Sequence, residues 1–145
     1  MPTCPISRKQ RGATMLEVLI TVLILAIGLL GVAAMQMMAL RNSQQSHQQS
    51  MATIFSYSIL DSMRANVDAA RNGDYNVTRL CTAPVNTATL AQKDQAYWLA
   101  ALKAQLGSGA CGAINCQGGD CTASVSWTDS RGGNDSGLVS TRTRL

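Results

Sequence analysis

The chain has 145 residues, enough for one small domain or for one domain with an added segment. Only 14% of the residues are charged and 4% are aromatic, whereas 46% are hydrophobic, and much of that hydrophobic content lies in one early stretch. This excludes a uniformly disordered chain, and the remainder is too small for a large buried active site. Five cysteines in so short a chain favour an oxidising compartment.

An uninterrupted apolar segment runs from Val18 to Met35 without a charge or a proline. It reaches the length at which a membrane-spanning helix is expected. A buried core helix is the weaker interpretation, because so small a remainder could not enclose an apolar helix on all sides. Three basic residues precede the segment and predict a cytoplasmic N-terminus, with everything after Met35 exported: Arg8, Lys9 and Arg11.

A cleaved secretory signal peptide is the main alternative, because it also combines a basic start, an apolar middle and small residues at the end. The apolar segment is longer than a usual signal core, however, and Glu17 lies at its front edge. A carboxylate costs about 2.5–3.5 kcal/mol at the centre of a membrane helix, and such residues are commonly paired and functional. Thr14 and Glu17 also have the spacing of a capping box, which predicts a local role at the start of the helix.

The segment from Arg11 to Leu19 reads RGATMLEVL. It resembles the class III leader junction of type IV pilins and pseudopilins, in which a short basic leader ends in Gly and Glu is the fifth residue of the apolar helix. The continuation, residues 27–36, is similar to the PilV-type minor pilins. The resemblance implies cleavage between Gly12 and Ala13, N-methylation of Ala13 and a role for Glu17 in subunit assembly. Ala13 departs from the Phe usual in major pilins, and no proline interrupts the helix.

The resemblance also implies a single-pass protein of the bacterial inner membrane with a periplasmic C-terminal domain, which later reaches the pilus and the cell surface. The partners it implies are prepilin peptidase, other major and minor pilins, the inner-membrane assembly platform and membrane lipid. The net charge is +4, but loss of the leader would remove three of 12 basic residues and leave nine against eight acidic ones. Two alternatives remain: a type II secretion pseudopilin, and a secreted, disulfide-stapled binding protein with a conventional signal peptide.

Beyond the membrane, residues 41–50 have the composition of a flexible linker. We prefer a continuing helix, because apolar residues resume a helical spacing afterwards at Ile54, Phe55, Ile59, Leu60, Met63 and Val67. Arg71 to Asp74 then supply a stop and a turn. The predicted organisation is a leader at 1–12, a transmembrane and assembly helix at 13–35, the periplasmic half of the helix at 36–72 and a small domain at 73–145.

A second helical pattern begins at Asp94 and ends at Gly107. One face of it is predicted to hold Tyr97, Trp98, Ala101, Leu102 and Leu106. A Gly- and Cys-rich loop follows, after which residues 122–128 alternate as a half-buried strand does, and residues 138–145 form a weaker strand. Asn134 and nearby glycines make a hairpin between them credible. The predicted fold class is α+β: a long N-terminal helix on a small antiparallel sheet, in a disulfide-stapled, pilin-like domain.

Cys4 lies in the predicted leader, which leaves four cysteines for three possible pairings: Cys81, Cys111, Cys116 and Cys121. We prefer Cys81 bonded to one of the later three, with a local loop between the other two. A metal site is the weaker alternative, because the close Cys-x2-Cys pairs of zinc modules are missing. Each disulfide is expected to stabilise a small domain by about 2–4 kcal/mol.

His47 is the only histidine and lies among Gln and Ser, so we expect it to be solvated. No Cys/His or Ser/His/Asp group can be assembled with any specificity, and the glycine-rich stretches lack a phosphate-binding pattern. We therefore expect no enzyme and no cofactor. Three basic residues form a loose tip near the end of the chain: Arg131, Arg142 and Arg144. Solvated charge is the preferred interpretation; DNA capture through phosphate contacts is the alternative, and it predicts salt-dependent binding.

Overall fold

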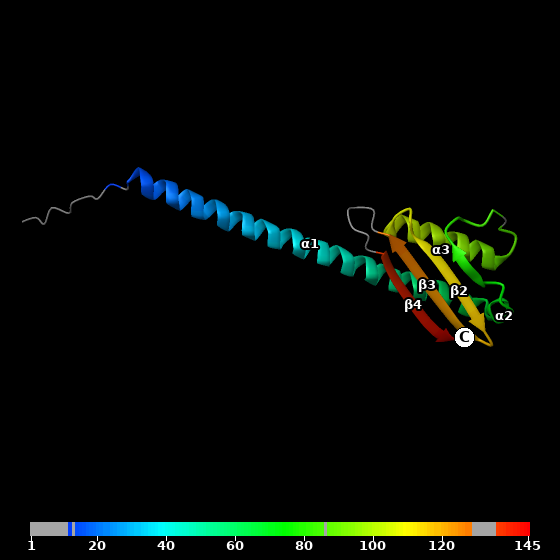
Figure 1. The fold of residues 1–145 in the computed structure, drawn as a ribbon. Coiled ribbons are helices and arrows are strands. Elements are labelled where there is room, and N and C mark those ends of the chain that lie inside the picture. The colour runs from blue at the N-terminus through cyan, green and yellow to red at the C-terminus, as the bar shows by residue number, and fades with distance from the viewer. Residues whose placement is uncertain (1–11, 13, 86, 129–135) are drawn as a thin grey trace, which may run out of the picture. The chain divides into compact units, whose positions relative to one another are not determined.

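The computed structural model describes residues 12, 14–85, 87–128 and 136–145. The chain forms two compact units, one ending at Asn42 and the other running from Ser43 to Leu145. The long helix and the antiparallel sheet confirm the predicted α+β class. The elements, labelled in Figure 1, are α1 (Met15–Ala65), α2 (Val67–Arg71), β1 (Val77–Leu80), α3 (Leu90–Leu106), β2 (Cys111–Gln117), β3 (Asp120–Thr128) and β4 (Ser136–Arg144).

The four strands form one antiparallel sheet in the order β1-β2-β3-β4. Strands β2 and β3 are joined by a tight turn in which Gly118 and Gly119 adopt φ angles of 58° and 92°. Residues other than glycine rarely adopt these backbone angles, which explains the glycine pair at this turn. The register of β3 with β4 is continuous from the Thr128–Ser136 pair to the Asp120–Arg144 pair. Each strand thus meets its sequence neighbour, and no crossover is needed.

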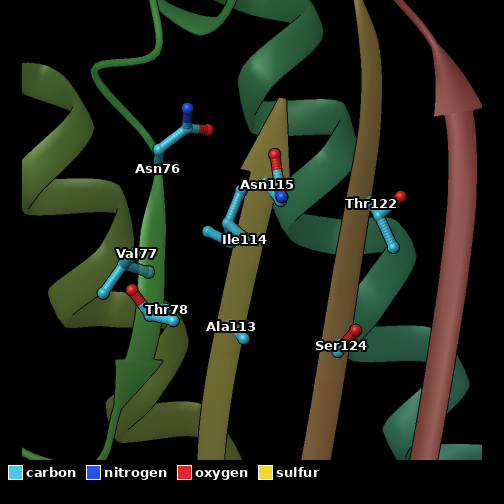
Figure 2. Close-up of a pocket in the computed structure, with 8 residues that line it drawn as sticks. All are labelled: Asn76, Val77, Thr78, Ala113, Ile114, Asn115, Thr122 and Ser124. Atoms are coloured by element: carbon cyan, nitrogen blue, oxygen red, sulfur yellow. The ribbon is translucent and has the colours of Figure 1, made fainter. Parts of the chain in front are cut away.

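One face of the sheet is covered by helices, and the other faces solvent. In β3, Cys121, Ala123, Val125 and Trp127 are buried, while the residues between them are half-buried or exposed. This alternation is the period-two pattern predicted for residues 122–128. Figure 2 shows α3 and the second part of α1 together on the far face, behind the strands. The polar Ser and Thr side chains of β3 therefore point to the uncovered face.

The core lies between the two helices and the covered face of the sheet. Helix α1 contributes Ile59, Leu60 and Met63, each at most 1% exposed, and α3 contributes Leu99 and Leu102. The apolar stripe predicted for residues 54–67 is therefore largely the core face of α1. Its first member, however, lies outside the core.

Two tryptophans occupy space that glycines leave open. A Cβ atom on Gly112 would overlap the ring of Trp98, and one on Gly137 would overlap the ring of Trp127. Gly137 is the cross-strand partner of Trp127, so the indole lies over a residue with no side chain. These glycines are required by packing, because any side chain there would displace a buried ring.

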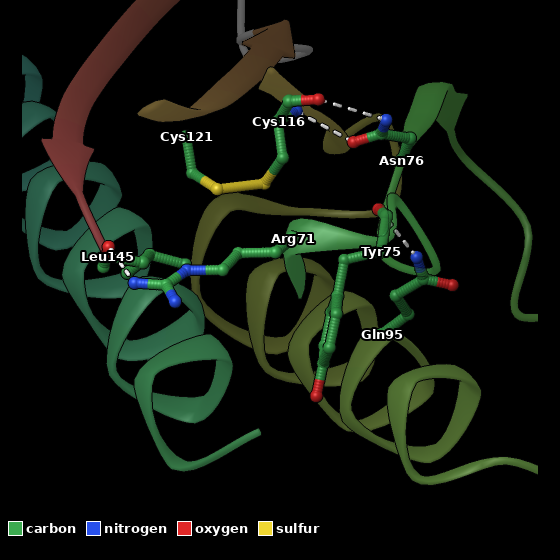
Figure 3. Close-up of a disulfide and its surroundings, with 7 residues drawn as sticks. All are labelled: Arg71, Tyr75, Asn76, Gln95, Cys116, Cys121 and Leu145. Atoms are coloured by element: carbon green, nitrogen blue, oxygen red, sulfur yellow. Dashed lines mark hydrogen bonds between the residues drawn. A yellow bond between two sulfur atoms is a disulfide. The ribbon is translucent and has the colours of Figure 1, made fainter. Parts of the chain in front are cut away.

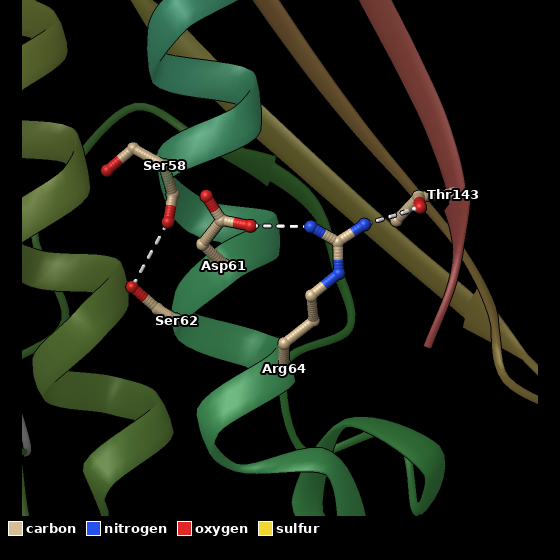
Figure 4. Close-up of polar contacts among 5 residues, drawn as sticks. All are labelled: Ser58, Asp61, Ser62, Arg64 and Thr143. Carbon is tan, nitrogen blue, oxygen red and sulfur yellow. Dashed lines mark hydrogen bonds and ion pairs between the residues drawn. The ribbon is translucent and has the colours of Figure 1, made fainter.

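Polar contacts fix the second part of α1 to the sheet. The hydroxyls of Ser56 and Thr141 lie 2.6 Å apart, and Arg64 donates from Nη2 to the hydroxyl of Thr143 at 2.8 Å. The other Arg64 nitrogen, Nη1, lies 2.6 Å from Oδ1 of Asp61, as Figure 4 shows. Buried Ser56 thus has a partner for its polar atom.

The structure corrects several details of the sequence prediction. Ile54 is 57% exposed and Tyr97 is 80% exposed, so neither lies on the core face assigned to it. Helix α3 begins at Leu90, four residues before the predicted Asp94, because Thr89 and Gln92 form a capping box. The segment predicted as a Gly- and Cys-rich loop contains the whole of β2.

Candidate functional site

The start of α1 is held by its own residues. The backbone N–H groups of Glu17 and Val18 donate to the carbonyl of Thr14 at 3.0 and 3.3 Å, and the N–H of Glu17 also lies 3.4 Å from the Thr14 hydroxyl. This is the hydroxyl half of the predicted capping box. The carboxylate of Glu17 makes no hydrogen bond or ion pair within the described residues. Within the part of the chain that the structure describes, it is therefore an exposed carboxylate without a partner.

The part of α1 in the first unit, up to Asn42, exposes every apolar side chain that the structure describes there. An 18-residue window within α1 has a mean hydropathy of 2.8, and none of it is buried. Leu25 is 64% exposed, and Leu30 is 72% exposed. Burying a leucine side chain is more favourable than leaving it in water by about 1.5–3 kcal/mol. Exposed apolar side chains in this number therefore favour contact with lipid or with another protein.

Two glycines interrupt the bulky side chains of this helix. Gly28 and Gly31 are three residues apart and thus lie on the same side of α1. A Cβ atom at either position would meet no atom within 4 Å. Small residues at this spacing allow a second helix to approach closely. The polar Thr21 is satisfied locally, because its hydroxyl donates to the carbonyl of Val18 at 2.8 Å.

Residues 7–33 match the prokaryotic N-terminal methylation motif. The motif indicates a type IV pilin-like or pseudopilin-like protein, and it implies processing by prepilin peptidase and assembly with other pilins. Together with one long apolar helix near the N-terminus, it is consistent with a membrane-anchored pilin. No curated protein and no solved structure matches the chain significantly. The functional interpretation therefore rests on the motif and on the apolar helix.

The predicted cleavage site lies at the border of the described residues. Gly12 is exposed, and a Cβ atom there would meet no neighbour within 4 Å. Ala13, Cys4 and the leader residues up to Arg11 lie outside the described part of the chain. Glu17 is four residues after Ala13, at the third position of α1. Cleavage after Gly12 and methylation of Ala13 thus stay predictions.

The four cysteines in the described part of the chain form two disulfides. Cys81 is bonded to Cys111, and Cys116 is bonded to Cys121. The sequence favoured disulfides over a metal site but left all three pairings open. The structure has this one, and it leaves none of these four cysteines free to bind a metal. The first bond closes a long loop that contains α3, and the second joins directly opposed residues of β2 and β3.

Hydrogen bonds around the second disulfide join Asn76 to Cys116 of β2 and Arg71 to Leu145, as Figure 3 shows. Asn76 accepts from the N–H of Cys116 at 2.7 Å and donates to its carbonyl at 3.3 Å. Arg71 donates to the carbonyl of Leu145 at 3.0 Å, and the N–H of Leu145 donates to the carbonyl of Gly119 at 2.8 Å. These bonds place α2, β1 and the end of β4 around one hairpin.

Tyr75 links this region to α3 through a buried polar cluster. Its hydroxyl donates to Oδ2 of Asp94 at 2.5 Å and accepts from Nδ2 of Asn66 at 3.2 Å. Its carbonyl accepts from the buried Gln95 at 2.9 Å. Burial, followed by the hydrogen bond to Asp94, raises the pKa of Tyr75 to about 12, because both disfavour the phenolate. The cluster is structural, since Tyr75 is fully buried.

The basic tip is only partly brought together. Arg142 and Arg144 lie two residues apart on β4, and Arg142 is 3.2 Å from Oδ2 of Asp120. Arg131 lies outside the described residues, and His47 is exposed on α1 as expected. One of the two described arginines is therefore already paired, and the contact with DNA stays an untested alternative.

The uncovered face of the sheet holds a shallow groove that the sequence analysis did not single out. One part, of about 360 Å³, is lined by polar residues that include Asn76, Asn115 and Thr122 and by apolar ones that include Val77, as Figure 2 shows. An adjoining part extends past Gln117 to the Asp120–Arg142 pair. The alternating Thr and Ser residues of β3 were the available signal. The groove itself depends on the register of three strands, which no single segment specifies.

Proposed function

We propose that this chain is a PilV-type minor pilin that is cleaved after Gly12, methylated at Ala13 and incorporated into the type IV pilus. It acts in pilus assembly and initiation, at the tip or in adhesion, and it catalyses no reaction. The observation that carries the proposal is the exposed apolar part of α1, which lies in the segment that matches the methylation motif. It begins with Glu17, whose carboxylate has no partner among the described residues.

Charge pairing explains why Glu17 stands at this position. Cleavage after Gly12 creates a new α-amino group at Ala13, close to the membrane surface. A carboxylate in hydrocarbon is unfavourable unless it is paired. The ammonium group of one subunit and Glu17 of its neighbour would neutralise each other, while Gly28 and Gly31 let the two helices approach.

The orientation follows from the charges that flank the helix. Arg8, Lys9 and Arg11 hold the leader in the cytoplasm, so the unit from Ser43 to Leu145 is exported. The disulfides fit that compartment, because disulfides persist in the oxidising periplasm and outside the cell. In this location the unit would present its surface to other pilus subunits or to a target.

The first test is the intact mass and N-terminal sequence of protein recovered from membranes of cells that contain a prepilin peptidase. A chain that begins at methylated Ala13 is the expected result. A start near Ala34 would mean a conventional signal peptide, and the pilin proposal would be withdrawn. Normal piliation but failed protein secretion after deletion of the gene would favour a type II secretion pseudopilin instead.

The second test separates the charge of Glu17 from its place in the helix. The Glu17→Ala variant should remain folded and membrane-bound but be absent from sheared pili. The control is Thr14→Ala, which removes the hydroxyl cap and keeps the carboxylate; it should still be incorporated. Normal pilus function in the Glu17→Ala variant would refute the assembly role.

A further inference from the structure

The two edges of the sheet differ in how well they are protected against pairing with another chain. Strand β1 has four residues and an irregular register with β2, and the disulfide of Cys81 follows it directly. Strand β4 has nine residues in continuous register and contains no proline. Short or irregular edges resist strand addition, whereas long regular ones accept it. The edge open to a partner is therefore β4.

The ladder between β3 and β4 determines which backbone groups are available. The N–H of Leu145 bonds to the carbonyl of Gly119, and bonded and non-bonded pairs alternate along antiparallel strands. Thr141 and Thr143 therefore direct their backbone groups to β3, whereas Ser140 and Arg142 direct theirs outward. Leu138 and Arg144 continue the outward series. Within the described chain, these outward groups bond to no other segment.

Side chains along this edge define what would fit beside it. Leu138 is 70% exposed at one end. At the other end Arg142 and Arg144 are both exposed. The carboxylate of Asp120 lies 3.2 Å from Arg142 and pairs with that arginine. Asp120 and Arg142 themselves remain partly open to solvent, with side chains 44% and 71% exposed. One cation at this end is thus without an acidic partner among the described residues.

We propose that β4 accepts an extended acidic segment of a second protein as a fifth, antiparallel strand. Acidic side chains of that segment lie beside Arg144 and Arg142, a small polar residue beside Ser140 and an apolar residue beside Leu138. Main-chain hydrogen bonds supply the affinity, and the alternate side chains supply the selectivity. This inference is independent of how the N-terminus is processed, because it uses only the unit that runs from Ser43 to Leu145.

A labelled peptide with the sequence Glu-Thr-Glu-Thr-Ser-Thr-Val-Thr tests the proposal by fluorescence anisotropy, with the full chain in neutral detergent micelles. Saturable binding is expected. A peptide with Lys in place of both Glu residues should bind at least about fivefold more weakly, since charged cross-strand pairs contribute up to about 1 kcal/mol each. The Arg144→Glu variant should reverse that preference.

Two substitutions at Ser140 separate strand addition from simple charge attraction. Ser140→Pro removes an outward N–H without breaking the bonds to β3, so the fold should survive and binding should fall by about tenfold or more. Ser140→Ala loses the same hydroxyl contact with Ser124 but keeps the N–H, and should bind as the unmodified protein does. Absence of saturable binding, or equal binding by both variants with tryptophan fluorescence unchanged, would overturn the proposal.

Discussion

Helix α1 carries apolar side chains in both units of the chain, but they are exposed in the first unit and partly buried in the second. Leu29 and Leu30 are 68% and 72% exposed, whereas Leu60 on the same helix is fully buried. The second unit supplies its own partners, in the form of α3 and the covered face of the sheet. The described part of the first unit supplies none, so its apolar side chains are covered only where another molecule packs against them.

The comparison explains why composition alone is a poor guide to this chain. A hydrophobic content of 46% is ordinary. Its apolar side chains fall into two groups, however: those exposed on the first unit and those buried in the core of the second. Only the second unit contains tryptophan, at positions 98 and 127. When the full chain is unfolded in neutral detergent, the change in tryptophan fluorescence therefore reports on the second unit alone.

The largest effect on the second unit is expected from loss of the disulfide between Cys81 and Cys111. Replacing both residues by serine should lower the free energy of unfolding by about 4 kcal/mol, because the sequence separation of 30 makes the loop-closure term large. Replacing Cys116 and Cys121, only 5 residues apart, should cost about 2 kcal/mol. Urea titration measures both, and equal losses would contradict the loop-length argument.

A matched pair of leucines tests the difference between the units directly. Leu102→Ala removes a fully buried side chain and should cost about 3 kcal/mol in the urea titration. Leu29→Ala changes a side chain that is 68% exposed in the first unit, and should leave the same transition unchanged. A loss in the Leu29→Ala variant as large as that in Leu102→Ala would mean that the units are not energetically separate.

The buried hydroxyl of Tyr75 makes the stability of the second unit fall at high pH. Its pKa rises from 10 in the unfolded chain to about 12 in the folded one, so the unfolded state loses the proton first. The stabilisation is complete below pH 10 and should decline by about 1 kcal/mol by pH 11, a loss that continues toward pH 12. Tyr75→Phe should remove this decline.

Tyr97→Phe is the control for the high-pH experiment, because the Tyr97 side chain is 80% exposed and changes its surroundings little on unfolding. Its urea midpoints at pH 9 and pH 11 should differ as those of the unmodified protein do. If Tyr75→Phe shows the same decline as Tyr97→Phe, the high-pH loss arises from other groups.

Much of the second unit is predictable because local patterns and long-range packing agree there. Residues 122–128 alternate in sequence and lie in β3, and the four cysteines form disulfides as expected, although the sequence left all three pairings open. The sequence did not predict β2, because Gly112 and the cysteines obscure the alternation of apolar and polar residues. Gly112 reads as a loop residue in the sequence, but the structure shows that it makes room for the ring of Trp98. Ile54 and Tyr97 were misplaced because helical spacing marks a wider apolar arc than the core covers.

The features of the candidate site also differ in how far the sequence predicts them. Glu17 was identified from its position beside an apolar segment, a signal that needs no tertiary structure. The free edge of β4 and the groove near Asn115 depend on strand order and register, which arise only when four separate segments pair. Sequence patterns therefore located the apolar part of α1 but not the exposed surfaces of the sheet.

The smallest effect is expected at the contact between Asp61 and Arg64, at the point where α1 meets β4. The side chains of Arg64 and Asp61 are 47% and 64% exposed, so solvent screens their attraction. Asp61→Asn should change the free energy of unfolding by no more than about 0.5 kcal/mol. Arg64→Ala should cost more, because it also removes the hydrogen bond to Thr143. If urea titration gives the two variants equal losses, the hydrogen bond from Arg64 to Thr143 adds no stability to the contact between α1 and β4.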